Sequence, residues 1–203
     1  MMTRLHDVRV GRVLVMTLHQ AIGEELPTRD DFYEHWLGPD RWRDHGLGLA
    51  PMAAVLGFLR TEGDGYGRVM ARAGQLAGQW AWDARPAWRR RLVVRLPKRL
   101  RRRVVARWLA RQVAETCPQT RATVRVSQRE CAITIAGSVF CGSREVPVEP
   151  LCGFYAAMGV ALFARAQVPV SGRMETCRAG TDKVNERSGD DKGARCTGRI
   201  TGS

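Results

Sequence analysis

The chain has 203 residues, of which 44% are hydrophobic and 26% are charged. This composition is typical of one folded domain, and it excludes a disordered chain, whose apolar content is too low to offset the entropy lost on ordering. The formal net charge of +13 favours partners with negative charge, such as phosphates, anionic lipid headgroups or acidic proteins.

The sequence shows no sign of export or of a membrane span. It contains no run of about 18 or more uncharged apolar residues, which a spanning helix would need. Arg9 and Arg12 interrupt the N-terminal apolar stretch, which therefore lacks the core of a signal peptide. The six cysteines are widely spaced, which favours reduced thiols over a disulfide framework. We therefore expect a cytoplasmic protein.

Helices are predicted through the first 115 residues of the chain. The predicted helices span residues 7–22, 27–38, 49–60, 66–82, 86–95 and 98–115. Asp30 and Asp31 suit the first turn of the second helix, where acidic side chains complement the helix dipole. Pro97 separates the last two helices. Small side chains allow the helix at 66–82 to pack closely on a neighbour, namely Ala71, Gly74, Ala77 and Gly78.

The two helices on either side of Pro97 form a basic segment. No Asp or Glu occurs between Arg85 and Arg111, and Trp88 and Trp108 stand among the arginines. This pattern fits a surface that binds nucleic acid or an anionic membrane, and it also fits a solvated face whose arginine stems cover the core. The candidate polyanion-binding residues are Arg89, Arg90, Arg91, Arg102, Arg103, Arg107 and Arg111.

The pattern changes to a period of two after Arg121. Residues 121–126 and 131–136 alternate as a β-hairpin with one buried face. A helix is predicted from Pro150 to about residue 165, and a strand at 168–176 with a kink at Ser171 and Gly172. The order of elements predicts an α+β fold, in which a helical N-terminal half packs on a small antiparallel sheet formed by a strand-strand-helix-strand C-terminal half.

The C-terminal residues are polar and rich in glycine. We expect a single ligand-binding domain at residues 1–187 and a mobile tail at residues 188–203.

The helix at 151–165 is apolar all round and lies between Cys152 and Cys177, so we expect it to be buried. No CxxC pair or HExxH motif occurs, and all four histidines lie in the first quarter of the chain. Isolated cysteines usually act as small buried hydrophobes, so we expect these two to line the core and no metal to bind. A zinc site formed by Cys141, Cys152 and Cys177 is the alternative.

Over most of residues 8–185 the chain resembles the 4-vinyl reductase domain, a hydrocarbon-binding and small-molecule-binding family. The resemblance rests on Cys152, Phe154, Tyr155, Leu162, Phe163 and the segment ETCRAG at 175–180. The basic segment and ARAGQLAGQW at 71–80 are also similar to parts of the family. The chain departs from the family at Asn185, where a second cysteine is usual.

The resemblance implies a fold like that of the small subunits of vesicle-tethering (TRAPP) complexes, with an internal cavity for a hydrophobic or aromatic ligand. The ligand-binding residues expected on this basis, and on the apolar character of the helix, are Cys152, Phe154, Tyr155, Met158, Phe163 and Cys177.

The function expected from this resemblance is non-enzymatic binding of the ligand, with an accessory role in (bacterio)chlorophyll or tetrapyrrole synthesis. One alternative is a protein whose basic surface binds nucleic acid or an anionic membrane. Whether the chain forms a homodimer is left open. Another alternative is a vinyl reductase. No flavin or nicotinamide motif is legible, so no cofactor is predicted and such a reductase would need an external electron donor.

Overall fold

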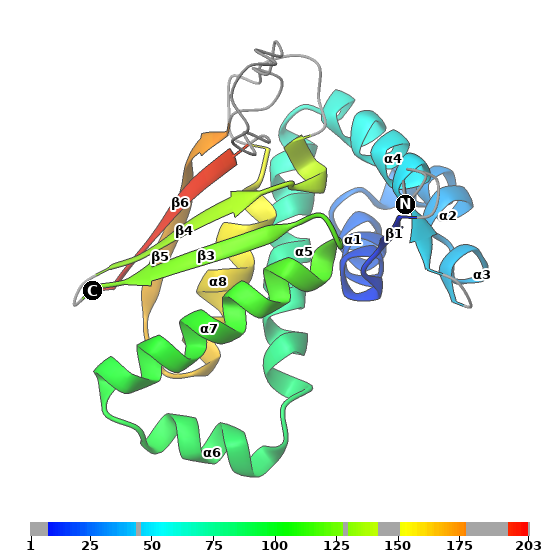
Figure 1. The fold of residues 1–203 in the computed structure, drawn as a ribbon. Coiled ribbons are helices and arrows are strands. Elements are labelled where there is room, and N and C mark those ends of the chain that lie inside the picture. The colour runs from blue at the N-terminus through cyan, green and yellow to red at the C-terminus, as the bar shows by residue number, and fades with distance from the viewer. Residues whose placement is uncertain (1–7, 44–45, 128–129, 142–150, 178–194, 203) are drawn as a thin grey trace, which may run out of the picture.

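The computed structural model describes residues 8–43, 46–127, 130–141, 151–177 and 195–202. It shows the α+β fold that the sequence predicts, with helices α7 and α8 on one face of a four-stranded sheet (Figure 1). Its helices are α1 (Arg12–Glu25), α2 (Asp30–Leu37), α3 (Pro39–Trp42), α4 (Leu49–Thr61), α5 (Asp64–Asp83), α6 (Ala87–Arg95), α7 (Lys98–Thr116) and α8 (Gly153–Arg165), with 3-10 turns η2 (Pro27–Arg29) and η3 (Val139–Cys141).

The helices follow the predicted pattern closely, apart from the short helix α3, which was not predicted, and a difference at the start of the chain. Residues 9 and 10 form β1 (Arg9–Val10), which pairs with β2 (Leu47–Gly48), so α1 begins at Arg12. The backbone N–H of Gly11 donates to the carbonyl of Thr116 at 2.9 Å, which ties this corner to the end of α7. Pro97 separates α6 from α7 as expected, because it cannot donate a backbone hydrogen bond.

The main sheet is antiparallel with the strand order β3-β4-β6-β5. Its strands are β3 (Arg121–Val126), β4 (Glu130–Ala136), β5 (Val170–Cys177) and β6 (Arg195–Gly202). Helix α7 packs against β3 and β4, and α8 packs against β5 and β6. On β4 the alternating residues Cys131, Ile133 and Ile135 are buried, as the sequence pattern predicts.

Strand β6 corrects the prediction of a mobile tail. It lies between β4 and β5 and pairs with both along its length, so residues 195–202 belong to the core of the sheet, whereas 188–194 lie outside the described residues. Cys196, Gly198 and Ile200 are buried, with more exposed residues between them. Gly198 is closely packed, because a Cβ there would lie 2.6 Å from Met174 Sδ and 3.2 Å from the carbonyl oxygen of Arg173, so a larger residue would need these neighbours to shift. The alternation of buried and more exposed residues, rather than the polar composition, indicates the strand.

Strand β5 is irregular at a different place from the predicted kink. Ser171 and Gly172 stay in register with Thr201 and Ile200, and the register shifts between Met174 and Thr176. A bulge at this point leaves one residue of β5 without a partner on β6. The strand therefore recovers its pairing just before Cys177, which faces Cys196 in the register.

Helices α5 and α8 pack closely through glycine. A Cβ on Gly74 would collide with the carbonyl oxygen of Phe154, and one on Gly78 would collide with that of Met158. Both glycines are among the small residues predicted to allow close contact, whereas Ala71 is exposed and lies outside the contact. One hydrophobic core extends from α1 through α5 and α8 to β6, and it fixes the position of α8 relative to the sheet.

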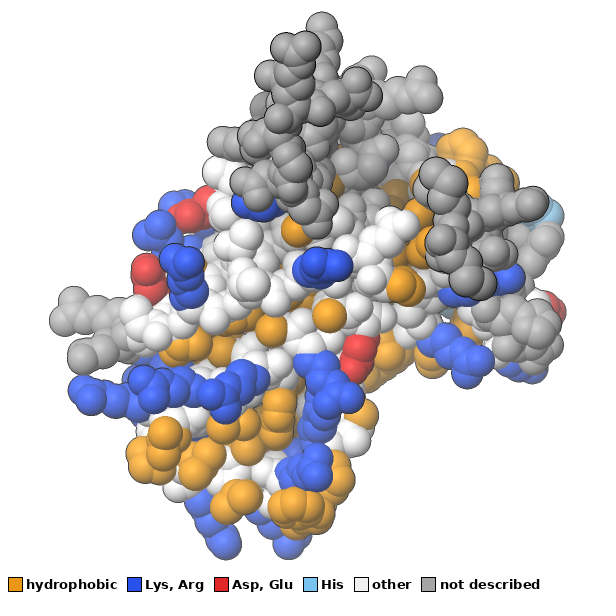
Figure 2. Space-filling view, viewed as in Figure 1, with side chains coloured by type: hydrophobic (Ala, Val, Ile, Leu, Met, Phe, Trp, Pro, Cys, Tyr) orange, Lys and Arg blue, Asp and Glu red, His pale blue; other side chains and the backbone are white. Residues whose placement is uncertain are grey.

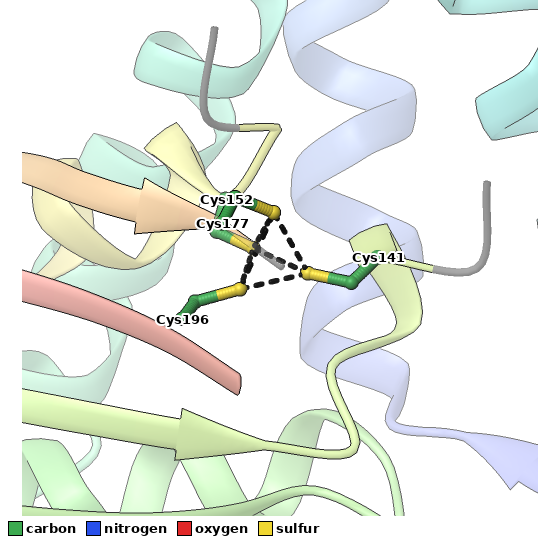
Figure 3. Close-up of side chains that lie close together, drawn as sticks. All are labelled: Cys141, Cys152, Cys177 and Cys196. Atoms are coloured by element: carbon green, nitrogen blue, oxygen red, sulfur yellow. Dashed lines mark hydrogen bonds between the residues drawn. The ribbon is translucent and has the colours of Figure 1, made fainter. Parts of the chain in front are cut away.

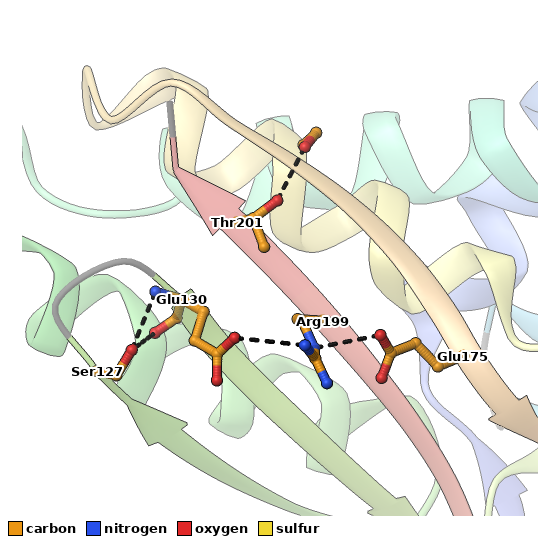
Figure 4. A network of polar contacts seen from close by, with 6 residues as sticks. Ser127, Glu130, Glu175, Arg199 and Thr201 are labelled. Carbon is orange, nitrogen blue, oxygen red and sulfur yellow. Dashed lines mark hydrogen bonds and ion pairs between the residues drawn. The ribbon is translucent and has the colours of Figure 1, made fainter.

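The outer face of the sheet is polar. Arg199 on β6 lies between Glu130 on β4 and Glu175 on β5, with nitrogen–oxygen distances of 3.7 and 3.2 Å (Figure 4). Ser171 and Thr201 share a hydrogen bond of 3.1 Å across β5 and β6. An open pocket of about 360 Å³ lies on this face, and its charged lining residues are Arg173, Glu175 and Arg199, of which Glu175 and Arg199 pair with each other.

Candidate metal centre

Four cysteine side chains meet at one end of the sheet (Figure 3). Cys141 ends η3, and Cys152 is the N-cap residue of α8. Cys177 is the last residue of β5 and is the Cα partner of Cys196 on β6. The four thiols thus come from four separate elements, and the fold brings them together although Cys141 and Cys196 are 55 residues apart.

The sulfur atoms lie at the corners of a compact tetrahedron. Their six separations range from 2.8 Å between Cys141 and Cys196 to 3.9 Å between Cys152 and Cys177. These distances exceed the roughly 2.05 Å of a disulfide, and all four cysteines are free. A zinc ion about 2.3 Å from each of four sulfurs would place them about 3.8 Å apart, so the cluster needs only a small expansion to accept the ion.

The geometry favours a single ion over a multinuclear cluster. Tetrahedral sites with four sulfur ligands select zinc or iron. Thiolates that bind an iron–sulfur cluster must surround several metal ions and bridging sulfides, which requires wider spacing than these sulfurs have. A four-cysteine site also leaves no coordination position open, which is typical of structural rather than catalytic zinc.

Hydrogen bonds among the thiols shift the pKa values of the cysteines in opposite directions. Bonds from Cys141 and Cys152 lower the pKa of Cys177 well below the usual range for a thiol. A hydrogen bond to Cys141 is the main cause of the raised pKa of Cys152, and another to Cys141 raises the pKa of Cys196. A divalent cation bound between the four sulfurs would stabilise their thiolate forms.

Aromatic and polar side chains enclose the thiols. Cys152 and Cys196 are fully buried, and the rings of Phe140, Phe154 and Tyr155 pack beside η3 and α8 with centroid separations of 5.3 to 5.5 Å. Ser138 Oγ lies 3.6 Å from Cys152 Sγ and so offers a hydroxyl to a thiolate there. Such outer contacts orient metal ligands and keep water away from them.

Two side chains from the helical half hold the segments that carry Cys141 and Cys152. Arg60 on α4 donates to the carbonyl of Phe140 at 2.8 Å, next to Cys141. The hydroxyl of Tyr66 on α5 donates to the carbonyl of Leu151 at 2.8 Å, next to Cys152. The cluster is therefore positioned by the helices as well as by the sheet.

The residues predicted to bind a ligand divide into three groups. Cys152 and Cys177 belong to the thiol cluster, whereas Phe154 and Met158 line a pocket of about 210 Å³ where α1, α5, α7 and α8 meet. Tyr155 and Phe163 are buried, and neither lines this pocket. The hydroxyl of Tyr155 lies 3.2 Å from that of Thr116, a residue that does line it.

Most of the arginines predicted to form a basic surface are exposed, but the prediction is wrong for Arg102. Arg102 is only 9% exposed and takes part in an interaction inside the fold, so it does not belong to a surface for polyanions. Its position in α7 turns it toward the buried side of the helix, where Val105 and Leu109 also lie. The remaining predicted residues are exposed or half-buried, namely Arg89, Arg90, Arg91, Arg103, Arg107 and Arg111.

Sequence reasoning considered three of the four thiols as an alternative and missed the fourth. The expectation that Cys152 and Cys177 only line the core assumed that no further ligand lies nearby. That premise is wrong, because Cys196 Sγ lies 3.0 Å from Cys152 Sγ and 3.4 Å from Cys177 Sγ. The alternation of Cys196, Gly198 and Ile200 with polar residues was the signal that could have placed Cys196 in the sheet.

Comparison of the chain with protein-family models, with curated proteins and with solved structures found no match. The similarity to the 4-vinyl reductase domain therefore stays a prediction. Among the helices of the part of the chain that the structure describes, none combines the length and apolar character needed to cross a membrane.

Proposed function

We propose that this chain binds one structural zinc ion through Cys141, Cys152, Cys177 and Cys196. The near-tetrahedral placement of four thiols from four elements, three of them buried and Cys177 half-buried, carries this proposal. Neutral thiols gain little from contact with each other, whereas four thiolates around a divalent cation gain both charge neutralisation and coordination. The ion would join η3, the start of α8 and the adjacent ends of β5 and β6.

Metal analysis of single-cysteine variants tests the zinc proposal. The wild-type protein, purified with zinc present, should contain one zinc per chain, and Cys141→Ser or Cys196→Ser should lose most of it. The matched control is Cys131→Ser, because Cys131 is also buried but lies outside the cluster, and burial raises the pKa of its thiol to about 11. Zinc content equal in wild type and the cluster variants would contradict the proposal.

The pocket beside α8 supports a second function, which is the binding of a small aromatic molecule. Phe154 and Met158 give it an apolar wall, and Arg12, Gln112 and Glu115 add polar groups. A cavity of roughly 150 Å³ accepts benzene, and pockets for larger ligands begin near roughly 300 Å³. At about 210 Å³, this pocket suits a compound with one ring better than a tetrapyrrole.

A melting screen tests ligand binding in this pocket. Phenol, benzoate and toluene should be compared with a porphyrin, and a ligand that binds only the folded state should raise the melting temperature. Val13 is 42% exposed and lines the pocket, so Val13→Trp should fill it and abolish the shift. Met16→Trp is the control, because Met16 is exposed on the same helix but does not line the pocket. Equal shifts in both variants would place the ligand elsewhere.

A further inference from the structure

Large apolar side chains are exposed along α6 and at the start of α7, a region that we call the α6–α7 corner. Trp88 is 61% exposed, Leu92 is 54% exposed and Leu100 is 48% exposed. These are the three most exposed large apolar side chains among the residues that the structure describes. Exposed apolar groups that cluster in this way usually mark a surface that meets another molecule or a membrane.

The same corner carries a dense positive charge. Neither Asp nor Glu occurs from Arg85 to Arg111. The nearest acid in the sequence, Asp83, already accepts from Arg90 at 3.1 Å and from Arg165 at 2.6 Å. Figure 2 shows blue and orange side chains intermixed over α6 and α7, at the bottom of the view. The exposed cations around the apolar residues are Arg89, Arg91, Arg95, Lys98 and Arg99.

The helical geometry of α6 places cations on both sides of an apolar ridge. Trp88 and Leu92 are four residues apart and therefore share a face. At about 100° per residue, Arg89 falls on one side of this ridge, and Arg91 and Arg95 fall on the other. The Arg89 guanidinium carbon lies 5.0 Å from the centre of the Trp88 ring, so charge and apolar surface meet at the same point.

Several contacts hold the corner in place. Val93 is buried beneath α6. Arg101 donates to the carbonyl of Leu96 at 3.0 Å and to that of Ala166 at 3.4 Å, which fastens the turn around Pro97 to the end of α8. The apolar ridge is therefore presented by a fixed part of the fold.

A pocket of about 360 Å³ adjoins the ridge. Trp82, Ala87 and Val94 supply its apolar lining, and Arg90, Arg91 and Arg95 supply positive charge. An apolar lining beside guanidinium groups matches a molecule that has hydrocarbon next to a phosphate. Phospholipids have this structure, whereas the phosphates of nucleic acid are flanked by sugars.

We propose that the α6–α7 corner, defined by Trp88, Leu92, Leu100 and the surrounding arginines, docks on the surface of a membrane that contains anionic phospholipid. Tryptophan favours the boundary between headgroups and acyl chains, and clustered arginines attract anionic headgroups. Two exposed leucines have no partner in a nucleic-acid groove. A second copy of this chain would bring like charges together, which opposes self-association through this face.

Vesicle sedimentation at two salt concentrations tests the proposal. The protein should bind vesicles of phosphatidylcholine mixed with phosphatidylglycerol, and should leave vesicles of phosphatidylcholine alone in the supernatant. Binding should weaken as salt rises, because salt screens the attraction between charges. Each cation at an anionic surface contributes about five-fold in affinity, so Arg89→Gln/Arg95→Gln should weaken binding by about thirty-fold.

Matched variants separate the local surface from the total charge. Arg121→Gln/Arg125→Gln removes two exposed arginines from β3 and should leave vesicle binding nearly unchanged. Trp88→Ser/Leu92→Ser should weaken binding, whereas Val13→Ser/Met16→Ser, which changes exposed apolar residues of α1, should not. Circular dichroism and melting curves establish that each variant is folded.

Three outcomes would overturn the proposal. The first is no binding to anionic vesicles at low salt. The second is tight binding to duplex DNA that Arg89→Gln/Arg95→Gln weakens and Trp88→Ser/Leu92→Ser leaves unchanged, which would assign the corner to nucleic acid. The third is a wild-type dimer that Trp88→Ser/Leu92→Ser converts to a monomer, which would assign the corner to a second copy of the chain.

Discussion

The burial of Tyr33 on α2 has a consequence for how stability depends on pH. Its side chain is 1% exposed, and its hydroxyl donates to Glu62 Oε1 at 3.2 Å. Burial, with a smaller contribution from the negative charge of Glu62, raises the pKa of Tyr33 to about 12. The unfolded chain releases this proton near pH 10, whereas the folded chain retains it to about pH 12.

The fold should therefore lose stability as the pH rises. Between about pH 10 and pH 12 the unfolded state binds fewer protons than the native state, so the free energy of unfolding falls with pH. Tyr33→Phe removes this ionisation and should flatten the decline in urea unfolding measurements across that window. A Tyr33→Phe variant that declines as steeply as wild type would show that Tyr33 does not ionise in this way.

At the residue scale, the sequence predicted which side chains are buried better than it predicted their chemical roles. The apolar helix between Cys152 and Cys177 correctly indicated that Phe154, Tyr155 and Met158 are buried. The chemical role of the cysteines could not be predicted, because a metal site requires four ligands to meet in space. Cys177 and Cys196 are 19 residues apart, and only the register of β5 and β6 places them side by side.

At the scale of elements, two glycines of α5 provide a matched test of helix packing. Gly74 has no space for a Cβ against the backbone of Phe154, whereas a Cβ on Gly67 would meet nothing within 4 Å. Gly74→Ala should lower the free energy of unfolding by about 1–3 kcal/mol, because α5 and α8 would be forced apart. Gly67→Ala should raise it by about 0.5–1 kcal/mol, since alanine favours the helix. Chemical denaturation measures both, and equal effects would contradict this packing.

Most helices and the strands β3 and β4 were predictable because their signals are local. The acids at the start of α2, the proline between α6 and α7, and the alternation in β4 each act within a few residues. Strand β6 has a short alternating pattern that the polar, glycine-rich sequence around it obscured. Its glycine at 198 reads as a loop signal, but in the structure it packs closely against Met174 on the adjacent strand.

At the scale of the whole molecule, β6 joins the two outer parts of the sheet. It pairs with β4 on one side and with β5 on the other, and it carries Ile200 into the core. Removal of residues 195–203 should therefore abolish cooperative thermal unfolding, because β5 would lose its partner and the core would be exposed. Scanning calorimetry of the truncated chain measures this. A truncated chain that melts like wild type would restore the prediction of a mobile tail.

The overall architecture followed from the order of elements, but the position of the last strand did not. A helical half followed by strand, strand, helix and strand predicts helices on one face of a sheet, as the structure shows. The sequence does not indicate that β6 inserts between β4 and β5, because this pairing joins segments far apart in the chain. The thiol cluster depends on the same long-range pairing, so the cluster could not be predicted without knowledge of that pairing.

X-ray absorption at the zinc edge tests the proposed metal centre most directly. The purified, zinc-loaded protein should show four sulfur atoms at about 2.3 Å from the metal, with no nitrogen or oxygen ligand. This result would place Cys141, Cys152, Cys177 and Cys196 around one ion, as their sulfur positions suggest. A signal from nitrogen or oxygen ligands, or from fewer than four sulfurs, would contradict the four-cysteine site.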